Sequence, residues 1–171
     1  MAAFSKIRPN LWFDGQAEAA ASFYVSIFKD ARILSVDDIS AGPAEGNKIV
    51  TFELEDLQFT AFDAGPHFRF TLAISFEIAC DSQAEIDYFW EKLGHGGETQ
   101  QCGWLQDRFG LSWQISPAEL PQLMQKNPKA VMEAYLAMTK VDIAQLRAAA
   151  QQGRTRTRRS TQIQQSSRRP K

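Results

Sequence analysis

The sequence predicts an α+β fold made of two βαβββ modules, followed by C-terminal helices. Segments with strand and helix periodicity alternate in an order that occurs twice along the chain. The helices of both repeats begin alike, with Gln16-Ala17-Glu18 and Gln83-Ala84-Glu85. A length of 171 residues suits one domain, or two half-size modules that share a core, better than two independent domains.

The first module is expected over residues 1–66. A short apolar run at 7–13 predicts a strand, and after Gly15 the apolar side chains follow helical spacing as far as Phe28. Lys29-Asp30 interrupts this pattern. Three further strands are then predicted, at 31–36, 48–54 and 57–63.

The second module is expected over residues 67–116 and repeats this order. It begins with a strand at 70–80 and a helix at 82–93, whose inward side includes Ile86, Phe89 and Leu93. The turn His95-Gly96-Gly97 follows. The module then closes with strands at 98–101, 103–106 and 111–116.

C-terminal helices are predicted within residues 117–150, at 118–124, 129–138 and 141–150, with Pro121 and Pro128 as breakers. Residues 151–171 form a basic tail that we expect to be disordered, because it has almost no apolar side chains to bury. The tail holds seven of the 19 Lys and Arg residues and none of the 20 acidic residues, so the rest of the chain carries 12 basic against 20 acidic residues. The tail is interpreted either as an arm for nucleic acid or an acidic partner, or as a solvated extension, which we favour.

Alternation within the strands assigns the side chains to two faces of a curved, mixed or antiparallel sheet, with helices on its outer face. Leu11 and Phe13 oppose Asn10 and Trp12, and Trp113 opposes Gln114. The apolar set should pack on the helices. The opposite set should either face solvent or line a concave ligand cleft.

Composition and motifs exclude several classes of protein. No apolar stretch reaches the roughly 18 residues of a membrane span, and the first residues do not resemble a secretory signal. Cys80 and Cys102 form no CxxC pair, which fits a reducing cytoplasm and implies neither a disulfide framework nor a thiolate zinc site. The sequence also lacks the Gly-rich phosphate loop, the nucleophile elbow and the HExxH zinc helix.

Several segments carry a family resemblance: Leu11 to Glu18, Phe23-Tyr24 with Ile27-Phe28, Gly65-Pro66 with Phe68 and Phe70, and above all Cys102 to Ile115. Together they resemble the PhnB-like branch of the vicinal oxygen chelate superfamily, which includes glyoxalases, bleomycin-resistance proteins and extradiol dioxygenases. The resemblance covers about residues 6–150 and implies a homodimer in which both chains complete the clefts. Members of this branch are often labelled demethylubiquinone methyltransferases, but a methyltransferase would normally need a parallel sheet and a Gly-rich first turn.

The resemblance also implies where a divalent metal would sit, because catalytic members of the superfamily hold one with four side chains, typically His or Glu. By strand and register the four positions fall near Asn10, Asp63, Ala73 and Gln114. Only Asp63 is a carboxylate and none is an imidazole, so we expect no standard metal site and no cofactor.

Candidate catalytic residues are few. Asp63 and Glu77 would form an acid/base pair if both reached the cleft, and His67 would serve as a base or ligand from the connection between the modules. Each also has a structural interpretation: Asp63 as a turn cap, Glu77 as a solvated strand residue, and His67 as an exposed loop residue. The expected cleft is lined by Asn10, Trp12, Asp63, Ser75, Trp104 and Gln114.

Two classes of function remain open from the sequence. The first is a metal-free pocket that binds a small molecule; the second is a metal-dependent lyase, isomerase or dioxygenase of the glyoxalase type. The absent metal ligands favour the binding protein. Methyl transfer and nucleic-acid binding through the tail are weaker alternatives, and whether the protein is an enzyme stays undecided.

Overall fold

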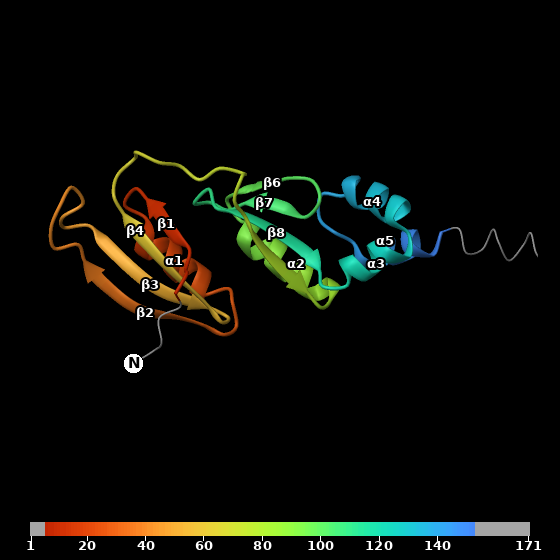
Figure 1. The fold of residues 1–171 in the computed structure, drawn as a ribbon, viewed down its shortest axis with the longest axis horizontal. Coiled ribbons are helices and arrows are strands. Elements are labelled where there is room, and N and C mark those ends of the chain that lie inside the picture. Colours follow the sequence, from red (N-terminus) through yellow and green to blue (C-terminus); the bar gives the residue numbers. More distant parts are fainter. Residues whose placement is uncertain (1–5, 153–171) are drawn as a thin grey trace, which may run out of the picture. The chain divides into compact units, whose positions relative to one another are not determined.

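The computed structural model describes residues 6–152, so the predicted disorder of the basic tail lies almost entirely outside the described residues. The chain divides into two compact units (Figure 1). Unit 1 contains the described residues up to 75 together with 95–97 and 106–112, and unit 2 contains 76–94, 98–105 and the residues from 113 onward.

Unit 1 is built on a four-stranded mixed sheet in the order β1-β4-β3-β2. Its strands are β1 (Asn10–Phe13), β2 (Ala31–Asp38), β3 (Lys48–Leu54) and β4 (Leu57–Asp63). β1 runs parallel to β4 and pairs Asn10 with Thr60 and Trp12 with Phe62, whereas the other neighbours are antiparallel. Helix α1 (Ala17–Val25) connects β1 to β2.

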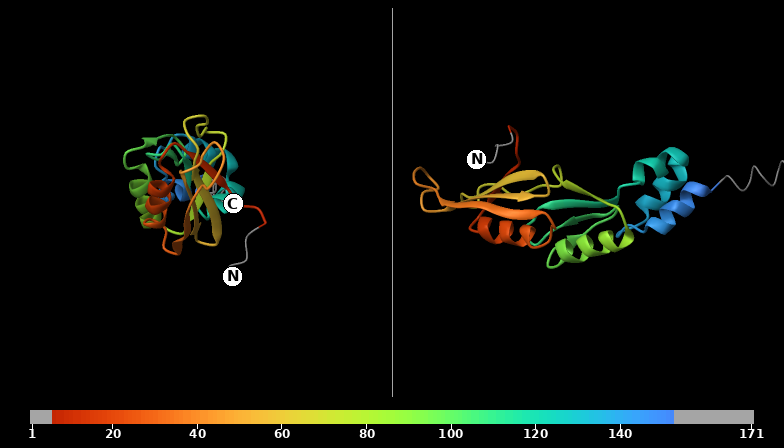
Figure 2. Two further views of the ribbon diagram at one scale, coloured as in Figure 1. Left: turned by 90° about the vertical axis from the view of Figure 1, so that its left-hand side faces the viewer. Right: turned by 90° about the horizontal axis from the view of Figure 1, so that it is seen from below.

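The core of unit 1 lies between α1 and one face of this sheet (Figure 2). Ala17, Ala20 and Ala21 of α1 are buried, and such small side chains let the helix backbone approach the sheet closely. The sheet contributes the large apolar partners of these alanines, among them Leu11, Phe13, Val50, Phe52 and Phe59. The predicted alternation in β1 is therefore confirmed, with Leu11 and Phe13 buried and Asn10 exposed.

The sheet of unit 2 repeats this topology in the order β5-β8-β7-β6, with β5 parallel to β8. Its strands are β5 (Phe76–Cys80), β6 (Glu98–Thr99), β7 (Trp104–Gln106) and β8 (Ser112–Pro117). Helix α2 (Gln83–Gly94) lies between β5 and β6 in the chain and packs on this sheet through Ile86 and Leu93. In both modules the first strand pairs with the fourth, so the predicted α+β fold with two βαβββ repeats is confirmed.

Between β8 and residue 152, where the description ends, the chain forms three helices: α3 (Leu120–Lys126), α4 (Pro128–Leu136) and α5 (Ile143–Gln151). Asn127 accepts a hydrogen bond from the Ala130 amide and caps α4, whose first residue is Pro128. Asp142 caps α5 in the same way through the Gln145 amide. None of the helices in the described part of the chain is long and apolar enough to cross a membrane.

The predicted strand at 70–80 is wrong in its first half. β5 begins only at Phe76, and Leu72 and Ile74, whose apolar alternation favoured a strand with both side chains in the core, are 49% and 70% exposed. The reason is the register: Phe76 pairs with Trp113, one residue into β8, so the residues before 75 have no neighbouring strand there. They form a local turn instead, in which the Ile74 amide donates to the Thr71 carbonyl.

Candidate functional site

A cavity of about 250 Å³ opens in unit 1 beyond the end of β1. Its lining comes from three segments of the chain: Trp12, Phe13, Asp14 and Gln16; Phe68, Arg69 and Phe70; and Gln106, Phe109 and Gly110. We call this cavity the aromatic pocket, because five of its ten lining residues carry aromatic rings. Small-molecule sites are typically concave and largely apolar, with a few polar groups, and the aromatic pocket has this character.

Trp12 is held firmly at one side of the aromatic pocket. Its indole Nε1 donates a hydrogen bond of 2.8 Å to the Gly65 carbonyl. Its ring makes edge contacts with Phe68, at 4.8 Å between centroids, and with Phe62, at 4.9 Å. Edge-to-face packing of this kind fixes the orientation of a ring as well as burying it.

Phe13 provides the inner side of the aromatic pocket. It is buried on the helix-facing side of β1 and contacts Phe70 and Phe109, with centroid distances of 5.3 Å and 6.4 Å. Alternation in β1 places Trp12 and Phe13 on opposite faces of the strand. The aromatic pocket lies at the end of this strand, where both side chains contribute to its lining.

Asp63 supports the base of the aromatic pocket without lining it. Its Oδ1 accepts hydrogen bonds from the backbone amides of Gln16, at 2.7 Å, and Ala17, at 2.9 Å. These are the first amides of α1, which have no partner within the helix, and a negative charge at a helix N-terminus is favourable. Asp63 thus fixes the start of α1 and the position of Gln16.

The polar groups of the aromatic pocket are one cation, one carboxylate and two amides. Arg69 and Asp14 are exposed, and neither forms an ion pair within residues 6–152. The Gln106 side chain donates through Nε2 to the Gly110 carbonyl. Among the described residues, no His, Cys, Ser or Lys lines the aromatic pocket; its aromatic walls and few polar groups can hold and orient a flat molecule.

The residues predicted from the sequence fall into both units. Unit 1 holds Asn10, Trp12, Asp63, His67, Ala73 and Ser75, and unit 2 holds Glu77, Trp104 and Gln114. Among them only Trp12 lines the aromatic pocket. His67 is exposed, and Glu77 accepts a hydrogen bond of 2.7 Å from the Ser116 hydroxyl. Asp63 and Glu77, considered as an acid/base pair, lie in different units.

The family metal positions in unit 1 do not suit a metal ion. Asp63 lies on the same face of β4 as the buried Phe59 and Ala61. Its Oδ1 already accepts hydrogen bonds from two backbone amides. The side chain of Ala73 has no atom that could bind a metal. Residues 6–152 contain no group of three or more His, Cys, Asp or Glu side chains that could hold a metal ion. Of the implied positions in unit 1, only Asp63 carries a carboxylate, and one of its oxygens is already bound to these two amides.

Sequence reasoning missed most of the aromatic pocket. Phe68 and Phe70 were noted only as part of the resemblance, and Phe109 only within the closing motif. Their positions in the sequence do not indicate a shared site, because the segments 68–70 and 106–110 come close to β1 only in the tertiary structure. The one usable signal was the pair Phe68 and Phe70 in a single loop, where burial in a strand or helix does not explain them.

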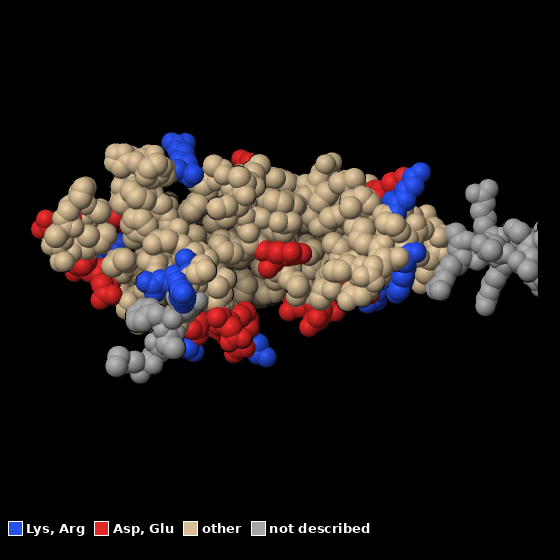
Figure 3. Space-filling view, viewed as in Figure 1, with Lys and Arg blue, Asp and Glu red and all other residues tan. Residues whose placement is uncertain are grey.

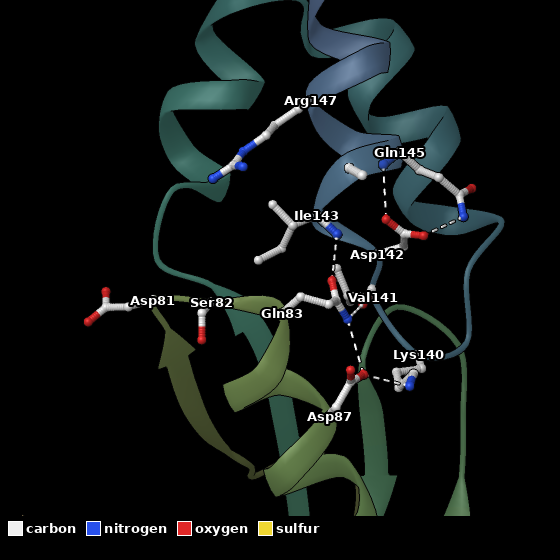
Figure 4. Close-up of a pocket in the computed structure, with 11 residues that line it drawn as sticks. Asp81, Ser82, Gln83, Asp87, Lys140, Val141, Asp142, Ile143, Gln145 and Arg147 are labelled. Atoms are coloured by element: carbon white, nitrogen blue, oxygen red, sulfur yellow. Dashed lines mark hydrogen bonds and ion pairs between the residues drawn. The ribbon is translucent and has the colours of Figure 1, made fainter.

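A second and larger cavity, of about 620 Å³, lies in unit 2 between α2 and α5 (Figure 4). Several of its polar groups are paired with one another. The Gln83 side chain accepts from the Ile143 amide and donates to the Val141 carbonyl and Asp87, while Lys140 pairs with Asp87 at 2.6 Å. We therefore interpret this cavity as the junction that joins the C-terminal helices to α2 rather than as a ligand site.

Replacing Gln83 by Ala should lower the free energy of unfolding by about 2 kcal/mol, since the Ile143 amide and the Val141 carbonyl lose partners at a partly buried position. Urea denaturation followed by circular dichroism measures this change. Gln122→Ala, at an exposed position of α3, is the control and should change stability by less than about 0.5 kcal/mol. Equal stability of the two variants would contradict the assigned role of Gln83.

Charged side chains on the face drawn in Figure 3 lie in small groups of either sign among uncharged residues. On this face, the described part of the chain presents no continuous basic surface of the kind that follows a phosphate backbone. The basic tail, on which the nucleic-acid alternative rests, lies outside the described residues.

Comparisons with known proteins agree with this architecture. The family model described as 3-demethylubiquinone-9 3-methyltransferase matches residues 5–116. A solved structure described as a putative 3-demethylubiquinone-9 3-methyltransferase, PhnB protein, from Bacillus cereus is 34% identical over 67% of this chain and 100% of that chain, with a TM-score of 0.61. No curated protein sequence matches the chain.

More distant structures share the fold alone. A protein from Pseudomonas aeruginosa is 21% identical over 67% of this chain and 98% of its own, with a TM-score of 0.55. The fosfomycin resistance protein FosX from Listeria monocytogenes, in complex with Mn(II) and a dihydroxypropylphosphonic acid, is 18% identical over 71% of this chain and 98% of its own, with a TM-score of 0.50. With the repeated βαβββ topology, these findings establish that the chain belongs to the 3-demethylubiquinone-9 3-methyltransferase family, the PhnB-like branch of the vicinal oxygen chelate superfamily.

Proposed function

We propose that this protein binds a small molecule whose flat, apolar part enters the aromatic pocket, and that it does so without a metal of the standard superfamily kind. The observation that carries the proposal is the set of Trp12, Phe13, Phe68, Phe70 and Phe109 around a cavity of about 250 Å³. Aromatic walls favour a planar ring through stacking and edge contacts. Arg69, Asp14 and the amides of Gln16 and Gln106 lie at the same cavity and would orient polar substituents.

Methyl transfer, which the family description names, is not supported by the local chemistry. The sheets are mixed rather than parallel, and the connection from β1 to α1 is short, with Gly15 as its one glycine. Such a connection offers no Gly-rich cradle for a nucleotide-like cofactor. A metal-dependent reaction of the glyoxalase type is the second candidate, since the FosX structure contains Mn(II).

Homodimer formation also belongs to this proposal. Phe68, Leu72 and Ile74 are 67%, 49% and 70% exposed in one stretch of the chain, and apolar side chains gathered in this way commonly mark an interface. Light scattering of the full chain should therefore give the mass of two copies. A monomer at all concentrations would contradict the dimer and leave the ligand proposal standing. A cytoplasmic location remains part of the proposal.

The binding proposal is tested with full-length dialysed protein, by elemental analysis and by thermal shift with phenol, indole, benzoate and 1-naphthol, each with and without Mn²⁺. At least one aromatic compound should raise the melting temperature without Mn²⁺, because a ligand of the native state stabilises it. Trp12→Phe should weaken that binding about tenfold, a loss of about 1.4 kcal/mol. Trp104→Phe, in unit 2, is the matched control and should bind as the unmodified chain does.

Three results would contradict the binding proposal. One is that none of the aromatic compounds raises the melting temperature. Stabilisation by Mn²⁺ together with a stoichiometric bound metal would favour the metal-dependent enzyme. Equal weakening by the Trp12 and Trp104 substitutions would show that the compounds do not occupy the aromatic pocket.

A further inference from the structure

The turn at residues 107–111, which we call the Asp107 turn, is organised by one carboxylate. Oδ1 of Asp107 accepts hydrogen bonds from the amides of Phe109, at 2.8 Å, and Leu111, at 3.1 Å. The Asp107 amide donates to the Leu111 carbonyl, and the Gly110 amide donates back to the Asp107 carbonyl. Gly110 has φ of +85°, which a residue without a Cβ adopts readily. The Asp107 side chain therefore sets the conformation of the whole turn.

The second carboxylate oxygen of Asp107 ties the turn to α1. Oδ2 accepts a hydrogen bond of 2.9 Å from the hydroxyl of Tyr24, which is 1% exposed. Burial and the nearby Asp107 charge raise the pKa of Tyr24 well above its usual value. The hydroxyl thus stays protonated, and able to donate, at neutral pH. Asp107 itself is 3% exposed, so this bond lies away from competing water.

The side chains of the Asp107 turn pack on the same helix. The ring of Phe109 contacts Phe23 at 5.6 Å and Tyr24 at 6.1 Å, in addition to Phe13. The Arg108 guanidinium lies over the ring of Phe23, 4.0 Å from its centroid, in a cation–π contact. Although these residues belong by sequence to the second module, the whole turn is part of unit 1.

A close backbone approach at Gly97 also supports the Asp107 turn. A Cβ added to Gly97 would overlap the carbonyl oxygen of Gln106 and crowd the backbone of Asp107. Only a residue without a side chain permits this packing. The backbone of Gln106 and Asp107 is therefore packed against Gly97, in addition to the contacts of the Asp107 turn with α1.

We propose that Tyr24 and Asp107 are positioning residues for the aromatic pocket, holding Gln106, Phe109 and Gly110 in place as one of its walls. Neither Tyr24 nor Asp107 lines the pocket; both act through the turn that does. The inference rests on the proposed ligand-binding function and deepens it. Loss of the Tyr24 hydroxyl should loosen the turn, and a ligand would then have to restore the wall at the expense of its own affinity.

The test compares Tyr24→Phe with Tyr135→Phe in the full-length protein. Tyr135 is a matched control, because its hydroxyl also donates a partly buried hydrogen bond, of 2.7 Å, to the Cys102 carbonyl, but in unit 2. The measurements are the affinity for 1-naphthol, the melting temperature, and the hydrogen exchange of the Phe109 and Leu111 amides by nuclear magnetic resonance. Asp107→Asn is the conservative variant. Its side-chain oxygen can still accept from the backbone amides of Phe109 and Leu111, and its side-chain nitrogen can donate to the Tyr24 hydroxyl.

Both tyrosine variants should melt at lower temperature. Only Tyr24→Phe should speed exchange of the Phe109 and Leu111 amides, by about tenfold or more, and weaken 1-naphthol binding by about fivefold to tenfold. Asp107→Asn should retain most of the affinity. If the loss of 1-naphthol affinity arose only from lower stability of the fold, it would be the same in Tyr24→Phe and Tyr135→Phe.

Two results would overturn the inference. One is unchanged 1-naphthol affinity in Tyr24→Phe despite faster exchange at Phe109 and Leu111, and the other is an equal loss of affinity in Tyr24→Phe and Tyr135→Phe. Failure of 1-naphthol and the other aromatic compounds to bind the unmodified protein would instead refute the proposed function. In that case unchanged amide exchange in Tyr24→Phe would additionally refute the tie between α1 and the turn.

Discussion

Replacement of Gly103 by Ala is expected to destabilise the protein by about 3 kcal/mol or more, the sum of left-handed strain and overpacking. Gly103 has φ of +75°, and an added Cβ would overlap the Ile115 carbonyl oxygen and touch Val141 at 3.0 Å. Two hydrogen bonds hold the backbone of Gly103 in this position. The Gly103 amide donates to Thr139, and its carbonyl accepts from Ile115 at 2.8 Å.

Gly42→Ala is the control that separates the cost of a positive φ from the cost of steric overlap by the added Cβ. Gly42 also has a positive φ, of +91°, but a Cβ there would meet no atom within 4 Å. Its cost should be about 1 kcal/mol, the conformational penalty alone. Urea denaturation of both variants measures the difference, and equal losses would show that the close approach at Gly103 relaxes without cost.

Asp107→Ala should lower the free energy of unfolding by about 3 kcal/mol, because three donors lose a charged acceptor in a buried place. These donors are the Tyr24 hydroxyl and the amides of Phe109 and Leu111. The Asp107 turn should lose its fixed conformation at the same time. Chemical denaturation and the exchange of the two amides measure both effects.

Asp38→Ala is the control for the loss of a carboxylate. Asp38 pairs with Lys48 on the surface of unit 1, where its side chain is 69% exposed, and pairs of this kind contribute little. Its replacement should leave stability almost unchanged. If Asp107→Ala were equally mild, the hydrogen bonds of Asp107 would not be what organises the turn.

Much of the fold could be predicted because it depends on local patterns. Apolar alternation in β1 and helical spacing in α1 and α2 identified the elements within a few residues of their ends. The repeated order of elements then predicted two equivalent βαβββ modules, whereas their separation into two four-stranded sheets came from the structure. The start of β5 could not be predicted this way, because Leu72 and Ile74 continue the apolar alternation of a strand where no partner strand is present.

The candidate site could be predicted only in part. Trp12 was identified as a cleft residue because it shares a strand face with Asn10, and it does line the aromatic pocket. Asp63 was identified as a turn cap or an acid, and it holds the first amides of α1. Phe109 and the Asp107 turn were outside the reach of such reasoning, because their partners Tyr24 and Phe13 lie far away in the chain.

The sequence by itself determined the α+β class, the two βαβββ repeats and the family, since periodicity and motifs are properties of neighbouring residues. Only the tertiary structure decided that the Asp107 turn of the second repeat lies against α1 of the first. The physical reason is that hydrogen bonds and ring contacts act over a few ångströms in space, whatever the separation along the chain. That packing is what turns five dispersed aromatic residues into one pocket.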